Sequence, residues 1–300
     1  MNGRAWLTLL RPPNLFTAPG DPLAGAMLAS GALGLSPVWS SIFPLLGAAV
    51  LLYAAGLLAN DFFDRSIDAQ ERPDRPIPSG SVKPTSVLAI AILLTLGGII
   101  FSGLAGRIAL MLSTLLALAV WFYNAIGKRM AWLASFSMGL CRGLSLLMGA
   151  AVTGISGLTA TPVMVSAIAL TLVIASITSL ARDEACPTGA PVPRLTRWGI
   201  PVVLTAWLAM MAYRATANSP DLGLILAAMA VLWSVVWIIT LKPSAPPRTI
   251  QAAVGGLIRG LLFTQAALCA FTGPEGQEAA LILLIAFPVS GWLGKWFYGS

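Results

Sequence analysis

Long apolar segments dominate the sequence and leave few folds open to it. Only 10% of the 300 residues are charged, against about 25% in soluble domains. Runs of about 20 apolar residues are long enough to cross a bilayer as helices. We identify such runs near residues 14–35, 40–59, 86–106, 108–126, 131–152, 161–180, 199–217, 221–241, 252–271 and 279–297. We therefore expect one all-α domain over residues 1–300, a polytopic transmembrane bundle of nine to ten helices.

The basic residues predict how this bundle is oriented. With a cytosolic N-terminus, most of the 18 Lys and Arg residues fall in cytosolic segments, and only Arg107 and Arg214 fall on the opposite side. Membrane proteins show this bias. The net charge of +7 is spread over short loops, whereas a nucleic-acid partner requires one basic face. We expect an integral protein of the bacterial inner membrane, without a nucleic-acid partner.

Three further features limit the chemistry and the processing of the chain. The absence of histidine excludes His-ligated zinc or haem and catalytic triads built on histidine. The three cysteines are far apart in the sequence, so we expect free thiols. Pro19, Asp21 and Pro22 interrupt the first apolar run, which argues against a cleavable signal peptide.

An acidic cluster lies between the second and third apolar runs. It holds five of the 11 acidic residues, namely Asp61, Asp64, Asp68, Glu71 and Asp74. Carboxylates near hydrocarbon are costly and indicate a functional site. Asn60, Asp64 and Asp68 are spaced i, i+4, i+8, which places them on one helix face, and Asp61 borders that face. Oxygen ligands without histidine or cysteine favour Mg²⁺ together with a diphosphate.

Basic residues near the cluster complete this hypothesis. Arg72 and Arg75 follow it in a proline-rich loop, and Lys128 and Arg142 belong to later segments. These side chains suit phosphate oxygens. The alternative is a solvated loop whose opposite charges merely pair with each other.

Three charged residues lie within predicted spans. Asp21, Arg142 and Arg259 all fall in the cytosolic half of their segments. Isolated charges at that depth are costly. We therefore expect them to face a shared central cavity that opens to the cytosol.

At this point several motifs resemble those of one family. NDFFDRSID, starting at Asn60, resembles the NDxxDxxxD motif of the UbiA superfamily of intramembrane prenyltransferases. ERPDRPIPSG resembles the continuation of that motif. Arg11-Pro12 and the Tyr123-Asn124 pair with Lys128 resemble two further family patterns. The resemblance implies a bundle in which Mg²⁺ binds a polyprenyl diphosphate, which is then ionised and captured by a lipophilic, often aromatic, acceptor.

The resemblance also implies roles for individual residues. Catalysis is assigned to Asp64, Asp68, Lys128 and Tyr123. Metal binding is assigned to Asn60, Asp61, Asp64, Asp68, Asp183 and Glu184. Diphosphate binding is assigned to Arg72, Arg75, Lys128, Arg142 and Arg182. Aromatic candidates for the cavity wall are Phe62, Phe63, Trp121, Phe122 and Tyr123, which are otherwise explained as an interfacial belt.

One departure from the family pattern concerns its second aspartate motif. At that place the sequence keeps only the adjacent pair Asp183 and Glu184, after Arg182. Neighbouring residues on a helix point about 100° apart, so the two acids cannot ligate one ion together. Either one acid supplies a single ligand and Arg182 replaces a metal charge, or the second site is lost. This pattern, with MGLCRGLSLLMG around Arg142, resembles a divergent branch called EboC-like.

Three functions remain as hypotheses from the sequence. The first is Mg²⁺-dependent transfer of a prenyl group to a lipophilic acceptor within the membrane. The second is a catalytically reduced relative that binds or transports a prenylated metabolite. The third is a secondary transporter. The sequence shows no repeat with Gly- or Pro-broken helices in matched positions, which argues against that class. The sequence predicts neither the oligomeric state nor the prenyl chain length.

Overall fold

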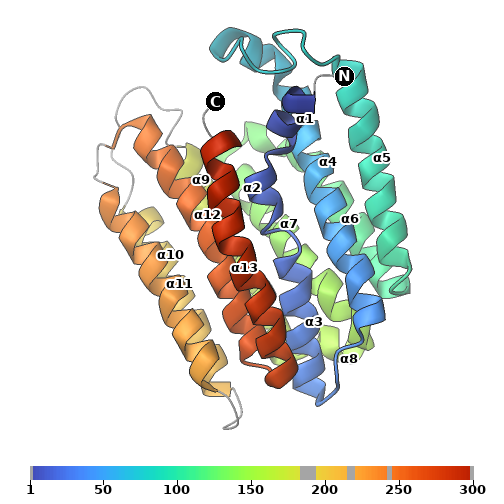
Figure 1. Cartoon of the computed structure of the whole chain (residues 1–300), viewed down its shortest axis with the longest axis vertical. Coiled ribbons are helices and arrows are strands. Elements are labelled where there is room, and N and C mark those ends of the chain that lie inside the picture. The colour runs from blue at the N-terminus through green and yellow to red at the C-terminus, as the bar shows by residue number, and fades with distance from the viewer. Residues whose placement is uncertain (1–2, 183–193, 215–219, 242–244, 298–300) are drawn as a thin grey trace.

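The computed structural model describes residues 3–182, 194–214, 220–241 and 245–297, and these residues form a helical bundle (Figure 1). The helices are α1 Gly3–Leu10, α2 Pro12–Leu15, α3 Gly20–Leu33, α4 Trp39–Glu71, α5 Pro84–Gly103, α6 Arg107–Ala125, η1 Gly127–Arg129, α7 Ala131–Ala150, η2 Ala151–Thr153, α8 Gly154–Leu158, α9 Thr161–Arg182, α10 Arg194–Arg214, α11 Pro220–Thr240, α12 Pro247–Ala270 and α13 Pro274–Phe297. The prediction of an all-α bundle is confirmed.

Each of the ten predicted segments coincides with a helix, although not every one is a full span. Eight of the described helices are long and apolar enough to cross a membrane. The first predicted segment is broken, because Pro12 and Pro13 open the short α2 and the chain turns before α3. With 14 residues, α3 measures about 21 Å, less than the hydrocarbon thickness of about 30 Å. The seventh segment, α10, includes arginines at both ends.

The outer surface of the bundle is apolar. Leu93, Ile100, Leu118 and Ile239 expose 65%, 64%, 62% and 64% of their surface, respectively. In water such a surface would be an aggregation hazard. In a bilayer these side chains meet lipid tails of the same polarity. The composition and this surface together identify an integral membrane protein.

The second predicted span continues well beyond its expected end. Helix α4 runs over 33 residues and stops at Glu71, just before Pro73. Proline disfavours helical backbone in the residue before it, and the polar residues after Ala59 are otherwise compatible with helix. The whole acidic cluster up to Glu71 is therefore carried on one helix.

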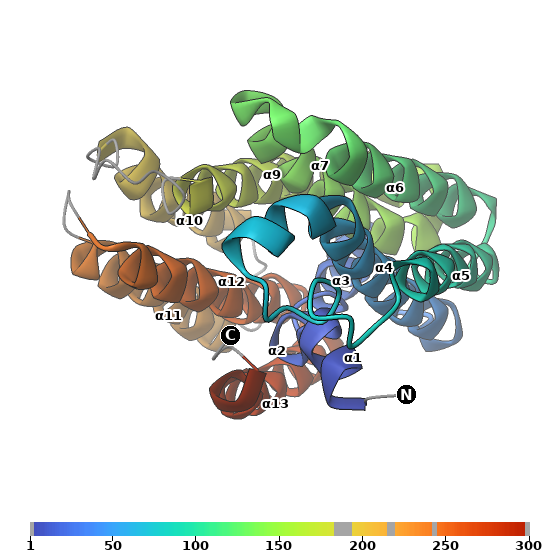
Figure 2. The same ribbon diagram turned by 90° about the horizontal axis from the view of Figure 1, so that it is seen from above.

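The charged segments gather at one end of the bundle, which we call the motif end. It contains α1, the last turns of α4 and the loop that leads to α5, and α13 also finishes there (Figure 1). Figure 2 looks onto this end and shows α3 inside a ring formed by the longer helices. From Gly20 to Ser30, every residue of α3 is buried. The centre of the bundle is thus built around α3.

Small residues let α3 and α7 approach each other closely. A Cβ atom added to Gly25 would lie 2.0 Å from the carbonyl oxygen of Leu146, and one added to Gly149 would lie 1.9 Å from that of Pro22. Such packing of small residues is typical of membrane helices. Because backbone meets backbone, the register between α3 and α7 is fixed. Polar side chains on these two helices are thereby held face to face.

Candidate active site

The acidic stripe of α4 lies at the motif end, beside the central cavity. Asn60 lines the cavity. Asp61 and Asp68 are only 5% and 6% exposed, while Asp64 is half-buried. Carboxylates so poorly hydrated require partners.

Two arginines from outside α4 partner the buried aspartates. Arg11 Nη2 donates to Asp61 Oδ1 at 2.7 Å. Arg75 Nη1 donates to Asp68 Oδ2 at 2.8 Å and lies 3.7 Å from Asp61 Oδ1. Arg11 adopts φ 43° and ψ 64°, a left-handed conformation that is uncommon for a residue other than glycine. This backbone strain at the α1–α2 junction is found where the Arg11 side chain meets the stripe, as strain often is at functional sites.

The remaining aspartate of the stripe is paired from a different helix. Lys128 Nζ lies 2.5 Å from Asp64 Oδ1. Lys128 belongs to η1, which follows α6, and Tyr123 lies one turn earlier on α6. The sequence-predicted residues Asp64, Lys128 and Tyr123 thus come from α4, η1 and α6, respectively, and lie together at the motif end. Opposite charges also pair here, as the alternative hypothesis expected, but they do so at the cavity and not in a solvated loop.

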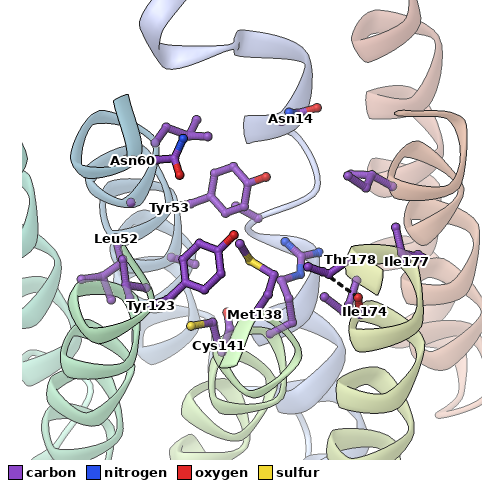
Figure 3. A pocket seen from close by; sticks show the side chains of 18 of the residues that line it. Asn14, Leu52, Tyr53, Asn60, Tyr123, Met138, Cys141, Ile174, Ile177 and Thr178 are labelled. Atoms are coloured by element: carbon purple, nitrogen blue, oxygen red, sulfur yellow. Dashed lines mark hydrogen bonds between the residues drawn. The ribbon is translucent and has the colours of Figure 1, made fainter. Parts of the chain in front are cut away.

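The central cavity has a volume of about 350 Å³, within the range of small-molecule sites. Figure 3 shows the hydroxyl groups of Tyr53 and Tyr123 pointing into it, below Asn60 and Asn14. Apolar side chains of α9 form the opposite wall. The complete lining is Arg11, Asn14, Ala18, Ala49, Leu52, Tyr53, Gly56, Leu57, Asn60, Leu116, Val120, Tyr123, Asn124, Met138, Cys141, Arg142, Ser145, Ile174, Ile177, Thr178, Ala181, Val254, Ile258 and Leu261.

A second polar cluster, which we call the deep end, borders this cavity within the bundle. Arg142 Nε lies 2.7 Å from Asp21 Oδ2, and Arg142 Nη2 donates to Asp21 Oδ1 at 3.2 Å and to the Thr17 carbonyl at 3.1 Å. Gln265 Nε2 donates to Asp21 Oδ1 at 2.7 Å. The side chain of Asp21 is fully buried. Arg142 lines the cavity as predicted, but its described partner is Asp21 and not the acidic stripe.

The other predicted diphosphate ligands lie around the motif end. Arg72 follows the last residue of α4 and is exposed. Arg182 ends α9, and its Nη1 is buried without a hydrogen-bond partner among the described residues. Asp183 and Glu184 lie outside the described residues.

One prediction about the cavity is wrong, and one pair of alternatives is resolved in part. Arg259 does not line it, because its side chain points toward α13, where a Cβ atom on Gly291 would lie 3.6 Å from Arg259 Nη1. Of the five aromatic candidates, only Tyr123 lines the cavity. Phe63 instead packs edge-on against Phe62 and Trp121. The position of these residues along their helices predicted how deep they lie in the bundle, but not which side of the helix they occupy.

Sequence reasoning also missed several residues of the site. Tyr53 precedes Asn60 by seven residues, two helical turns on the same face, so the stripe's own periodicity could have identified it. Asn124 donates to the carbonyl oxygens of Gly56 and Val120. Gln265 is a lone amide within an apolar span, which is itself a signal of a polar partner.

The metal-binding capacity of the site follows from its donor set. In the part of the chain that the structure describes, no group of three or more His, Cys, Asp or Glu side chains is placed to hold a metal by itself. Mg²⁺ typically uses only one or two carboxylates and completes its shell with water and substrate phosphate. Asn60 and Asp68 are about 12 Å apart along the helix, so one ion cannot reach all four side chains of the stripe. One or two of Asn60, Asp61, Asp64 and Asp68 suffice for that ion when a phosphate ligand is present.

Comparisons with known proteins place the chain in a family. Residues 22–241 match the model of the UbiA prenyltransferase family. The digeranylgeranylglyceryl phosphate synthase of Methanothrix thermoacetophila is 34% identical over 163 residues, 54% of this chain and 60% of the relative. The enzyme of that name from Methanosarcina mazei is 35% identical over 183 residues, 56% of this chain and 62% of the relative. The matches therefore span little more than half of these curated relatives.

Solved structures share the fold. A digeranylgeranylglyceryl phosphate synthase gives a TM-score of 0.61 at 19% identity, over 92% of this chain and 98% of the other. A UbiA homologue from Archaeoglobus fulgidus bound to DMAPP and Mg²⁺ gives 0.60 at 15% identity, over 89% and 98%. The EboC-like branch and the bacterial membrane remain predictions. The acidic stripe, the cavity and the family match lead to one conclusion: the chain belongs to the UbiA prenyltransferase family.

Proposed function

We propose that the protein transfers a prenyl group from a prenyl diphosphate to a lipophilic acceptor within the membrane, with Mg²⁺ as cofactor. The single observation that carries this proposal is the position of the acidic stripe. Asn60 of the stripe and Arg11, the partner of Asp61, line an apolar cavity. Asp64 and Asp68 continue the stripe beside it and pair with Lys128 and Arg75. Such a site can hold a charged head group at one end and a hydrocarbon chain at the other.

The motif end supplies the head-group site. One or two of Asn60, Asp61, Asp64 and Asp68 would hold Mg²⁺, which when bound stabilises the charge that develops on the leaving diphosphate. Arg75 and Lys128 neutralise the carboxylates here, and both are close enough to turn toward phosphate oxygens. Arg72 and Arg182 extend this positive surface. Arginine suits the role because its planar guanidinium can bind two phosphate oxygens at once.

The cavity supplies a dry environment for the reacting carbon. When the C–O bond breaks, its electron pair leaves with the diphosphate and positive charge develops on the prenyl carbon. The faces of Tyr53 and Tyr123 can stabilise that charge. The acceptor then donates an electron pair to the carbon and releases a proton. Exclusion of water by the apolar walls prevents hydrolysis from competing with transfer.

The relatives bear on the acceptor. Their names specify a glyceryl phosphate that carries two geranylgeranyl groups. We therefore propose a prenylated glyceryl phosphate alcohol as the acceptor class to test first, ahead of the aromatic acceptor predicted from the sequence. A protein that binds a prenylated metabolite without turnover is the second candidate, motivated by the reduced acidic motif at Asp183 and Glu184.

A transfer assay tests the proposal. Detergent-purified protein is incubated with Mg²⁺, radiolabelled C10 to C20 prenyl diphosphates, and either prenylated glyceryl phosphate or aromatic acceptors. We expect release of diphosphate coupled to a prenylated product, and loss of both when EDTA is added. Tight, Mg²⁺-dependent binding of the diphosphate without product from any acceptor would identify the binding protein instead.

We also propose that the motif end faces the cytosol, because the predicted cytosolic segments carry most of the basic residues. The exposed Ser66 and Ser156 lie near opposite ends of the bundle. In a chain whose native cysteines are replaced by serine, a membrane-impermeant maleimide should label Ser156→Cys in intact cells. Ser66→Cys should react only after the membrane is opened. The reverse pattern would overturn this orientation.

A further inference from the structure

Two side chains separate the central cavity from a second void. This void has a volume of about 10 Å³ and lies among α9, α10, α11 and α12, about the size of a single water site. Ile177 of α9 and Leu261 of α12 line both spaces. We call these two residues the partition. Each is only 3% exposed, so neither has solvent to move into.

The polarity of the cavity indicates where a prenyl chain would end. Asn60 and Arg11 line the cavity at the motif end, and Arg142, paired with Asp21, lines it at the deep end. A hydrocarbon tail pressed against that buried ion pair would leave polar atoms without compensation. The apolar route leads sideways, toward α9. Figure 3 shows Ile174 and Ile177 on the side of the cavity away from Tyr53 and Tyr123.

Beyond the partition most of the surrounding side chains are apolar. The second void is lined by Ile200 and Leu204 of α10 and by Ala230 and Trp233 of α11. Two hydroxyl side chains, Ser234 and Thr264, also line it, and Ser234 Oγ donates to the Val231 carbonyl oxygen. A chain that passed the partition would therefore meet further hydrocarbon-like surface and not solvent.

We infer that Ile177 and Leu261 set the upper limit of prenyl chain length, an inference that rests on the proposed function. A single Leu→Ala replacement in a packed core can leave a cavity of about 150 Å³, which holds the six carbons of benzene. One isoprene unit has five carbons. Removing either side chain would join the two spaces and admit one further unit.

The experiment compares Leu261→Ala with Leu204→Ala. Both remove the same atoms from a buried leucine, but Leu204 lines only the second void. Activity with Mg²⁺ is measured for C10, C15, C20 and C25 prenyl diphosphates. For Leu261→Ala, kcat/KM for the diphosphate one unit longer than the wild-type optimum should rise about tenfold relative to that optimum. The ratio for Leu204→Ala should stay within about twofold of wild type.

Substitutions at Ile177 test the chain-length preference in both directions. Ile177→Ala should shift the profile toward longer chains, as Leu261→Ala does, and Ile177→Phe should shift it toward shorter chains. If Leu261→Ala melts like Leu204→Ala and keeps the wild-type chain-length profile, the inference is wrong. Should the alanine variants not fold, Leu261→Val and Ile177→Val must both move the profile toward longer chains, and failure of both to do so has the same consequence.

A binding measurement separates this inference from the proposed function. The shift of the melting temperature by each prenyl diphosphate with Mg²⁺ reports chain-length preference without turnover. Wild-type protein that binds the series but transfers no prenyl group would refute the proposed activity and leave the inference testable. An unchanged binding preference in both partition variants would refute the inference even if transfer is observed.

Discussion

The molecule pairs arginine with aspartate in two regions, and the two pairs differ in their contact with solvent. At the motif end, the side chain of Arg75 is 24% exposed beside Asp68 at 9%. At the deep end, Arg142 is 9% exposed beside a fully buried Asp21. The deep pair also includes Gln265 and the Thr17 carbonyl. The arginine at the motif end is thus partly accessible to a ligand, whereas the arginine at the deep end is enclosed by the protein.

This difference in exposure distinguishes charges that can bind a ligand from charges that stabilise the bundle. Partly hydrated ion pairs contribute little to stability, so their members are available to a ligand. A buried pair is costly to assemble but far more costly to break, because one charge is then left without a partner. We therefore propose that the motif-end charges bind the substrate and that the deep pair maintains the structure of the cavity.

The largest effect should come from breaking the deep pair. Asp21→Ala leaves Arg142 buried without its counter-ion and should lower the free energy of unfolding by about 3–5 kcal/mol. Thermal melting in detergent measures this change. Asp64→Ala is the matched control, because its pair with Lys128 is about one-fifth exposed on both sides, and it should cost less than about 1 kcal/mol. Equal losses in the two variants would remove the distinction between the regions.

Next in size is the loss of activity when a carboxylate of the stripe is neutralised. Asp64→Asn keeps the shape of the side chain but removes the charge that would hold Mg²⁺. We expect kcat/KM for prenyl transfer to fall about 100- to 1000-fold, with a melting temperature close to wild type. Asp221→Asn serves as the control, since this exposed residue lies in the first turn of α11 and should leave turnover unchanged. A fully active Asp64→Asn would exclude the stripe from catalysis.

A smaller effect is expected from Arg75→Gln. The variant loses a charge-assisted contact to phosphate, so the Kd for a prenyl diphosphate in the presence of Mg²⁺ should rise about tenfold. Its free energy of unfolding should fall by about 1–3 kcal/mol, because the buried Asp68 loses its described counter-ion. Isothermal titration calorimetry measures the affinity. A large loss of stability with unchanged affinity would mean that Arg75 stabilises the end of α4 and does not bind the ligand.

The smallest effect on diphosphate affinity should come from the double variant Asp21→Asn, Arg142→Leu. It removes both buried charges, and with them the risk of an unpaired one. Because the native pair is neutral and deep, the Kd should change by less than about threefold. The sequence alone assigned Arg142 to the diphosphate, and a tenfold weakening in the same titration would restore that assignment.

Local patterns in the sequence predicted much of this molecule. Apolar run length located the helices, and the i, i+4, i+8 spacing of Asn60, Asp64 and Asp68 placed them on one face. These local patterns did not reveal contacts between residues that are far apart in the sequence. Arg11 meets Asp61 across 50 residues, and Gln265 meets Asp21 across 244. Such pairs follow from how helices pack, which hydropathy does not encode.

Two boundaries failed for a related reason. A hydropathy window ends where charges begin, yet polar residues are acceptable in a helix, so α4 continues to Glu71. The first span failed in the opposite sense, because Pro12 and Pro13 break the backbone within an apolar stretch. The sequence predicted how deep Arg259 lies in its span, but not that its side chain points toward α13.

The length of α4 has a consequence for traffic through the membrane. Its 33 residues amount to about 50 Å of helix, against about 30 Å of hydrocarbon, and its acidic turns are the last ones. In the proposed reaction, a diphosphate freed there would leave directly into the aqueous phase, while the hydrophobic product would stay among the lipids. The two products would then separate by their own solubilities.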